Sequence, residues 1–69
     1  MQGTITRINA ERGFGFIRPA GDSGRGDHFF HCHSLVDLVF AARLVGQPVE
    51  FDSAVGDKGL VANNVRPAK

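Results

Sequence analysis

Apolar and polar residues alternate over several short stretches of this chain, and each stretch ends at a cluster of turn-forming residues. Alternation with a period of two is typical of β-strands that bury one face. The stretches are also rich in β-branched and aromatic residues, which favour strands. The pattern predicts an all-β domain with five strands, at residues 3–9, 14–18, 27–33, 48–52 and 60–66.

The same alternation assigns one face of each strand to a hydrophobic core. Inward positions in the first and the last two predicted strands are held by Ile5, Val49, Phe51, Val61 and Val65. By parity Asn63 also points inward, where its polar side chain needs hydrogen bonds. Turn-forming residues predict a tight turn at 10–12, a flexible loop at 19–26 and a hairpin turn at 56–59.

Between the third and fourth predicted strands, the spacing of apolar residues changes to that of a helix. The segment Ser34-Leu35-Val36-Asp37 has the spacing of a capping box, and apolar residues stand at 35, 38, 39, 42 and 45. The sequence therefore leaves room for a short helix there. Five short strands with one such insert predict a closed or nearly closed barrel, because closure removes the edges that short strands otherwise expose.

The second predicted strand carries phenylalanine on one face and glycine on the other. Phe14 and Phe16 lie on the same side, while Gly13, Gly15 and Ile17 point to the opposite side. Ile17 belongs to the core, and glycine on that side lets the backbone of a small barrel bend sharply. Phe14 and Phe16 are therefore predicted to face solvent, and two exposed phenylalanines on one strand indicate a binding role.

The third predicted strand divides its side chains in a similar way, with Phe29 and His31 on one face and Phe30 in the core. If the two strands are neighbours, the outward rings form one aromatic surface. Every base has a π-face, so such a surface binds single-stranded nucleic acid at about 1–3 kcal/mol per stacked base. Cations that can contact phosphates are expected around it: Arg7, Arg12, Arg18 and Lys58.

Size and charge narrow the alternatives. Sixty-nine residues form one domain, residues 1–69, without room for a second domain or a large enzyme cleft. The net charge is only +1, so bulk electrostatics would not be the main source of affinity for nucleic acid. No stretch approaches the roughly 20 apolar residues that span a bilayer, so no membrane partner is expected. No signal peptide is visible, which predicts a cytoplasmic protein.

Residue types that zinc favours gather in the third predicted strand, at His28, His31, Cys32 and His33. Strand alternation places His31 and His33 on one face and His28 and Cys32 on the other, so no metal site is predicted. The single cysteine allows no intramolecular disulfide. The sequence contains no serine or cysteine triad, phosphate loop or paired-carboxylate pocket, so neither catalysis nor a cofactor is expected.

Two motifs resemble those of the cold-shock domain family. Arg12-Gly13-Phe14-Gly15-Phe16-Ile17 is similar to its first ribonucleoprotein motif, and Asp27-His28-Phe29-Phe30-His31 to its second. The resemblance covers the whole chain and implies a five-stranded antiparallel barrel of the oligonucleotide-binding type (OB-fold). It also implies a bacterial binder of single-stranded RNA or DNA that prefers pyrimidines and acts as an RNA chaperone or as a transcription or translation regulator.

The resemblance also assigns roles to individual residues. It implies Arg12 as a basic contact and Asp27 as a polar contact to a base edge. The base-stacking residues that it implies are Phe14, Phe16, Phe29, His31 and Phe40.

The sequence departs from the family pattern at several aromatic positions. The family's first-strand tryptophan is replaced by Arg7, and further aromatic residues by Ile8 and Cys32. Residues 36–39 replace a glycine-rich stretch before Phe40, which affects where that ring is placed. Arginine can stack on a base and also contact phosphate, so Arg7 compensates in part. We expect binding centred on the remaining rings and weaker than in a fully aromatic relative.

Two functions are consistent with these observations. The first is binding of single-stranded nucleic acid, as a monomer, by base stacking on the aromatic surface. The alternative is a degenerate cold-shock domain that mainly contacts a protein or a second copy of itself, including a strand-swapped homodimer. This alternative rests on apolar side chains that a small barrel cannot readily bury, namely Leu35, Val36, Leu38, Val39, Leu44 and Val45.

Overall fold

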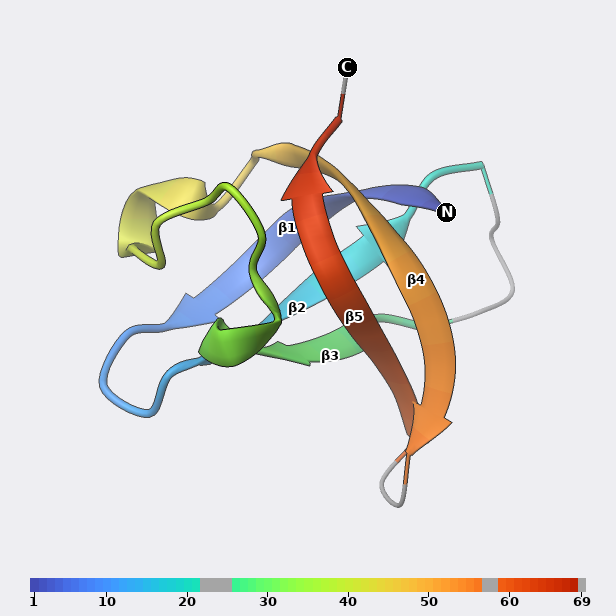
Figure 1. Ribbon diagram of the computed structural model, residues 1–69, viewed down its shortest axis with the longest axis horizontal. Helices are drawn as coiled ribbons and strands as arrows, with labels where there is room; N and C mark the ends of the chain where they lie inside the picture. Colours follow the sequence, from blue (N-terminus) through green and yellow to red (C-terminus); the bar gives the residue numbers. More distant parts are fainter. Residues whose placement is uncertain (22–25, 57–58, 69) are drawn as a thin grey trace.

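Five β-strands run through the residues that the computed structural model describes, 1–21, 26–56 and 59–68 (Figure 1). The strands are β1 (Gln2–Asn9), β2 (Phe14–Pro19), β3 (His28–His31), β4 (Pro48–Gly56) and β5 (Gly59–Pro67). Two short 3-10 turns, η1 (Cys32–Ser34) and η2 (Ala42–Leu44), lie between β3 and β4. The predicted all-β class is confirmed, with β3 shorter and β4 longer than predicted.

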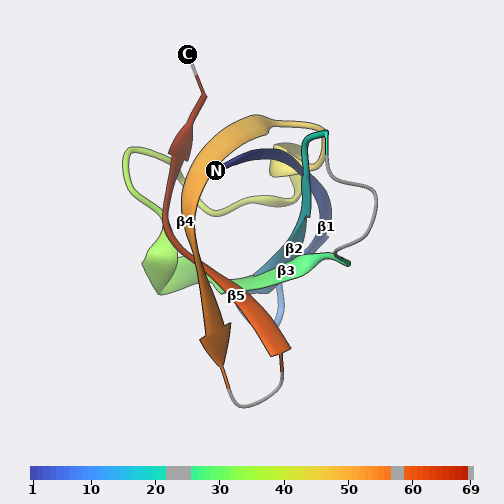
Figure 2. The ribbon, with the colours of Figure 1, turned by 90° about the vertical axis from the view of Figure 1, so that its right-hand side faces the viewer.

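The strands close into a barrel in the order β1-β2-β3-β5-β4, with β4 pairing again with β1. Figure 2 shows the ring that they form. β3 and β5 run parallel, with Phe29 opposite Val61, while the other neighbouring pairs are antiparallel. The chain crosses one end of the barrel after β3 and turns back in the β4–β5 hairpin, which leaves β5 parallel to β3. The predicted OB-type barrel is therefore present, but its sheet is mixed rather than fully antiparallel.

The core is apolar and lies inside this ring. Its buried residues are Ile5, Ile17, Phe30, Leu44, Val49, Phe51, Ala62 and Val65. The inward positions predicted in β1 to β4 are thereby confirmed. In β5 the prediction holds for Val65 but not for Val61, which is only half-buried, while its neighbour Ala62 is buried.

A β-bulge in β5 explains why the alternation fails there. The β4–β5 register shifts between Glu50 and Asp52, so that two residues of β5, Asn64 and Val65, lie opposite one residue of β4. Asn64 takes the left-handed backbone conformation, with a φ of 52°. The extra residue reverses the parity of the strand, and Asn63 is exposed. The prediction that Asn63 points inward is wrong for this reason.

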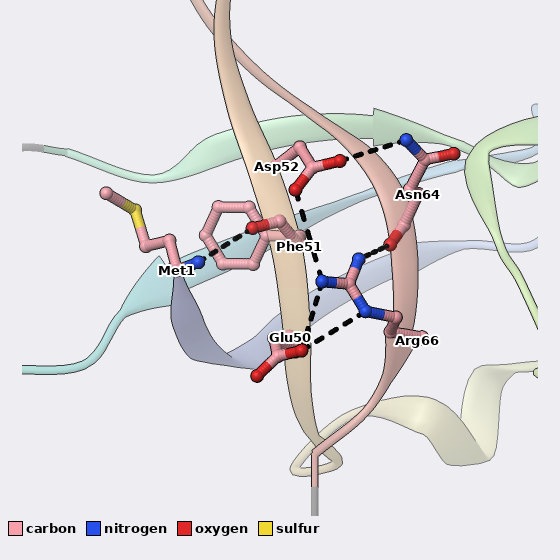
Figure 3. Close-up of polar contacts among 6 residues, drawn as sticks. All are labelled: Met1, Glu50, Phe51, Asp52, Asn64 and Arg66. Atoms are coloured by element: carbon pink, nitrogen blue, oxygen red, sulfur yellow. Dashed lines mark hydrogen bonds and ion pairs between the residues drawn. The ribbon is translucent and has the colours of Figure 1, made fainter.

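Polar side chains surround the outer side of the bulge (Figure 3). The Asn64 amide donates a hydrogen bond to Oδ2 of Asp52 at 3.0 Å. Arg66 donates from Nη1 to the Asn64 carbonyl at 2.7 Å, and its Nη2 lies 3.0 Å from Oε1 of Glu50. The charged groups are partly exposed, so each ion pair adds little to stability. The network mainly fixes the backbone of the bulge.

Replacing Asn64 by valine is expected to lower the free energy of unfolding by about 1–2 kcal/mol, because a β-branched residue is strained in the left-handed region. The matched control is Asn63→Val, one residue earlier on ordinary extended backbone, where an exposed substitution should stay within about 0.5 kcal/mol. Urea unfolding followed by circular dichroism measures both, since the chain has no tryptophan or tyrosine. Equal losses in the two variants would contradict a conformational role for Asn64.

The connection between β3 and β4 crosses one end of the barrel as two 3-10 turns rather than as a continuous helix. Leu35 forms an isolated parallel bridge with Val65, and Leu44 enters the core with 6% of its surface exposed. Leu38 and Phe40 are partly buried against the same core. Leu35, Leu38, Phe40 and Leu44 thus pack against the core, and of the predicted helical insert only the single turn η2 is helical.

The predicted turns fall where the strands end. Residues 10–13 form the turn between β1 and β2. Gly56 and Gly59 pair at the end of the β4–β5 hairpin, and residues 57 and 58 of that predicted turn lie outside the described residues, as do 22–25 of the predicted loop. Within the described ranges, no helix is long and apolar enough to cross a membrane.

Candidate nucleic-acid interface

Three phenylalanine rings lie together on the outer face of β2 and β3, and we call them the aromatic cluster. The two strands pair antiparallel, with Phe16 opposite Phe29 and Phe14 opposite His31. The centroid of the Phe14 ring lies 5.4 Å from that of Phe29, and each lies 5.9 Å from that of Phe16. Tilted and edge-to-face arrangements at these distances are the favourable ones for aromatic pairs.

Strand alternation separates the aromatic cluster from the core. Ile17 and Phe30 point into the barrel with 0% and 1% of their surface exposed. The three clustered rings are only half-buried. The two strands therefore have the sidedness that the sequence predicted, with one apolar face inside and an aromatic face outside. A planar ligand can reach the outer face without any rearrangement of the core.

A shallow groove of about 440 Å³ lies beside the aromatic cluster. It is lined by Arg7, Ile8, Asn9, Ala10, Glu11, Phe14 and Phe16. Arg7 pairs with Phe16 across β1 and β2, and its guanidinium carbon lies 6.0 Å from the centroid of that ring. This distance is at the outer limit of a cation–π contact. The groove thus combines a ring face with a guanidinium group.

A second bulge places Arg7 on this face. The β1–β2 register shifts between Ile5 and Arg7, which makes Thr6 an extra residue. Ile5 is buried, so strict alternation would bury Arg7 as well. The bulge instead leaves Arg7 exposed and lets Ile8 pack against the core. Alternation alone could not have found this position, because no glycine or proline marks the bulge.

Polar groups lie at the end of the aromatic cluster where β3 begins. The Thr6 hydroxyl lies 3.5 Å from Oδ2 of Asp27, and Oδ1 of Asp27 lies 3.8 Å from Nε of Arg18. The Arg18 side chain is 73% exposed and that of Asp27 35%, so this ion pair adds little stability and leaves both groups accessible. Thr6 was not predicted at the site, because it reaches Asp27 only through the β1 bulge.

Arg12 lies in the turn between β1 and β2. The Asn9 side-chain oxygen accepts a hydrogen bond from the Arg12 backbone N–H at 3.1 Å, and the Asn9 carbonyl accepts one from Gly13 at 2.9 Å. Gly13 has a φ of 76°, a conformation that favours glycine. The turn is therefore fixed by its own backbone contacts, and the Arg12 side chain is exposed two residues before Phe14.

His31 ends β3 beside Phe14 and is exposed. Its Nδ1 accepts a hydrogen bond from the His33 backbone N–H at 3.2 Å, and the two imidazole rings lie 4.7 Å apart. These local contacts hold the His31 ring at the end of the aromatic cluster that is opposite to Asp27.

Phe40, a predicted base-stacking residue, does not join the aromatic cluster. Phe40 is half-buried and packs against the core, as Leu35 and Leu38 also do. Residues 36–39 precede it in the connection between β3 and β4, and this path brings the ring against the core rather than to the outer face of β2 and β3. Lys58 lies outside the described residues.

The prediction that Cys32 lies on the opposite face from His31 and His33 is wrong. β3 ends at His31, and the following 3-10 turn brings the ligating atoms of His31, Cys32 and His33 within 4.8 Å of one another. His28 is separate, since it is fully buried and its Nε2 lies 2.8 Å from the Ser53 hydroxyl oxygen. The prediction extended strand alternation beyond His31, where the strand already ends. For this reason it missed the cluster that three of the four residues form.

The model of the 'Cold-shock' DNA-binding domain matches residues 1–68, which include β1 to β5 and the whole aromatic cluster. The chain belongs to the cold-shock domain family. The resemblance of its two phenylalanine motifs to that family is thereby confirmed.

Individual members of the cold-shock family are similar to this chain along nearly their whole length. Cold shock protein CspA of Staphylococcus saprophyticus is 41% identical over 64 residues, which cover 93% of this chain and 92% of that protein. Cold shock protein ScoF of Streptomyces coelicolor is 41% identical over 66 residues, 96% of each chain. The solved structure of Drosophila Unr CSD456 matches 99% of this chain with a TM-score of 0.74 at 26% identity; the match spans 26% of that longer chain.

Proposed function

We propose that this cold-shock domain binds single-stranded RNA or DNA by stacking bases on Phe14, Phe16 and Phe29. The observation that carries this proposal is the aromatic cluster itself, with three half-buried rings outside a core that is already filled. The part of a phenylalanine ring that stays exposed to water does not stabilise the fold, and a ligand with flat apolar faces explains why these rings lie outside the core. His31, at the end of the cluster, supplies a fourth ring.

The expected strength of this interaction is moderate. Three stacked bases at about 1–3 kcal/mol each contribute about 3–9 kcal/mol, and micromolar binding requires about 8 kcal/mol. Arg7 adds a guanidinium beside Phe16 in place of the family's aromatic residue. A guanidinium that stacks on a base and contacts phosphate recovers part of the lost stacking energy.

Polar residues around the aromatic cluster support contacts to base edges and phosphates. Asp27 accepts hydrogen bonds and therefore favours bases that present an amino or imino group on their edge. Arg7, Arg12 and Arg18 supply exposed cations on β1, β2 and the turn between them, and Lys58 is proposed as a further contact. Binding that depends on base stacking and uses few cations is moderate in strength, so the ligand can also be released. This suits a cytoplasmic RNA chaperone or regulator of a bacterial cell that prefers pyrimidine-rich strands.

A titration with oligothymidine, followed by amide chemical shifts and repeated at several salt concentrations, tests this function. We expect the largest shifts at Phe14, Phe16 and Phe29, and small shifts at the buried Phe51. The plot of log affinity against log salt should have a slope of magnitude about 2–3, from roughly 0.7 per phosphate neutralised on a single strand. Shifts spread over the barrel without a maximum at the aromatic cluster would contradict the proposal.

Contact with a protein or a second copy is the second candidate, and one observation favours it. In the segment that covers the barrel end, Val36, Val39 and Val45 expose 41%, 71% and 53% of their surface, whereas Leu44 is buried. The oligothymidine titration, combined with a measurement of apparent mass at several protein concentrations, separates the two functions. An apparent mass that rises with protein concentration, together with no oligothymidine binding, would favour this second candidate over base stacking.

A further inference from the structure

Three potential metal ligands meet at the end of β3. Of these three, the proposed function uses only His31. The ligating atoms of His31, Cys32 and His33 all lie within 4.8 Å of one another. The two histidines are exposed, and Cys32 is half-buried with a free thiol. Three consecutive residues can converge in this way because the backbone leaves the extended conformation at Cys32 and forms η1.

The distances suit a small tetrahedral ion. Zinc bonds of about 2.3 Å to sulfur and about 2.0–2.1 Å to nitrogen place neighbouring ligand atoms roughly 3.3–3.7 Å apart. Sγ of Cys32 already lies 3.7 Å from Nδ1 of His31. The remaining separations exceed this range by about 1 Å at most, which side-chain rotation of an exposed histidine can provide. If His31 binds the ion through Nδ1, the ion replaces the hydrogen bond that this nitrogen now accepts from the His33 backbone N–H.

The backbone of this cluster is anchored to the rest of the barrel. The Cys32 N–H donates a hydrogen bond to the Gly13 carbonyl at 2.8 Å. A Cβ atom built on Gly13 would lie 3.2 Å from Sγ of Cys32, so the thiol is close against the turn between β1 and β2. The sulfur therefore has a defined position, and the two flanking imidazoles supply the adaptable ligands.

The donor set determines the class of ion. One thiolate and two imidazoles are soft and borderline ligands, which favour zinc and similar ions over magnesium or calcium, and no carboxylate from the described part of the chain belongs to the cluster. We propose that His31, Cys32 and His33 bind one zinc-like divalent ion per chain, with the Cys32 thiol losing its proton and the fourth position left open. Three protein ligands and an open position are the arrangement of accessible zinc sites rather than of closed structural ones.

Cobalt is the probe for this site, because cobalt bound by a thiolate absorbs through sulfur-to-metal charge transfer and tetrahedral cobalt has intense visible bands. The reduced wild-type protein, without nucleic acid, is titrated with cobalt chloride and then with zinc chloride. We expect both absorptions to appear with one cobalt per chain and to disappear when zinc is added. Absence of the charge-transfer band at excess cobalt would overturn the proposal.

Variants separate a three-ligand site from metal bound by a lone thiol. Cys32→Ser should remove the charge-transfer band. His31→Ala and His33→Ala should each weaken cobalt binding by at least about 100-fold, since the loss of outer-shell partners alone costs about 10–100-fold. Ser34→Ala, the next residue along, is the matched control and should bind as the wild type does. If either histidine variant also binds as the wild type does, the thiol holds an adventitious ion only and the proposal is wrong.

The site shares His31 with the proposed nucleic-acid surface but can be tested independently of it. The cobalt titration contains no oligonucleotide, and the oligothymidine titration can be run with a chelator. A negative result for metal binding therefore does not contradict nucleic-acid binding, and a negative result for nucleic-acid binding does not contradict metal binding.

Discussion

The double variant Phe14→Ala, Phe29→Ala is expected to bind oligothymidine with a free energy about 2–6 kcal/mol less favourable than the wild type, because two bases lose their stacking partners. This corresponds to a loss of about 30-fold to about 20,000-fold in affinity. The two rings are the closest pair in the aromatic cluster, at 5.4 Å, and come from different strands, so their removal leaves only Phe16 there. Isothermal calorimetry or fluorescence anisotropy with a labelled oligothymidine measures the change.

Two controls show whether the loss comes from stacking. Phe14→Leu, Phe29→Leu keeps apolar side chains of similar size but removes the flat rings, and it should lose nearly as much affinity as the alanine variant. Val55→Ala removes an apolar side chain that is 82% exposed on β4, a strand that carries none of the three rings, and should leave affinity unchanged. If the leucine variant binds as tightly as the wild type, general apolar contact rather than base stacking would account for binding.

The sidedness of β2 and β3 could be predicted because neighbouring residues give opposite and unambiguous signals. Ile17 shares its face of the strand with Gly13 and Gly15, which fits the sharply bent inner wall of a small barrel. Phe30 lies on the face of its strand opposite to Phe29 and His31, so it takes the core position. That assignment put Phe14, Phe16 and Phe29 outside, where they lie. Period-two alternation is reliable here because both strands are short and regular.

The two bulges could not be predicted, and the one in β5 accounts for the wrong inward assignment of Val61 and Asn63. Thr6 and Asn64 each add one residue to a strand, and every later residue in that strand changes face. Asparagine tolerates the left-handed conformation better than most residues, so Asn64 is a weak signal after the fact. Thr6 gives no such signal. The bulges place Arg7 on the aromatic face and expose Asn63, two outcomes that strict alternation excludes.

The segment after β3 shows a different limit. Its apolar spacing fits a helix, but the residues of the segment that pack against the core are Leu35, Leu38, Phe40 and Leu44, while Val36 and Val39 stay exposed. Tertiary burial decided the backbone path, and local periodicity did not. The same early end of β3 brings Cys32 next to two histidines, which no rule based on alternation could have shown.

The substitution Gly15→Ala is expected to remove most of the stability of this domain, although it adds a single methyl group. A Cβ atom on Gly15 would lie 2.5 Å from the Arg7 carbonyl oxygen and 2.8 Å from two carbons of the Phe30 ring. The first of these neighbours is backbone and the second is a core ring, so neither can move without opening the β1–β2 pairing or the core. Overpacking of this kind costs about 3 kcal/mol or more. A domain of 69 residues has a total stability of only about 3–10 kcal/mol.

Gly56→Ala is the matched control, because Gly56 also lies in a strand and the nearest neighbour of a Cβ atom there would be a methyl carbon of Val61 at 3.2 Å, with the Gly59 carbonyl oxygen at an ordinary 3.7 Å. We expect it to change the free energy of unfolding by less than about 1 kcal/mol, measured by urea unfolding and circular dichroism. A Gly15→Ala protein as stable as this control would show that the barrel can open between β1 and β2. If Gly15→Ala is as unstable as expected, the glycine between Phe14 and Phe16 is required for the closed core. The phenylalanines on either side of it, Phe14 and Phe16, are then not needed to fill the core and can bind a ligand on the outer face.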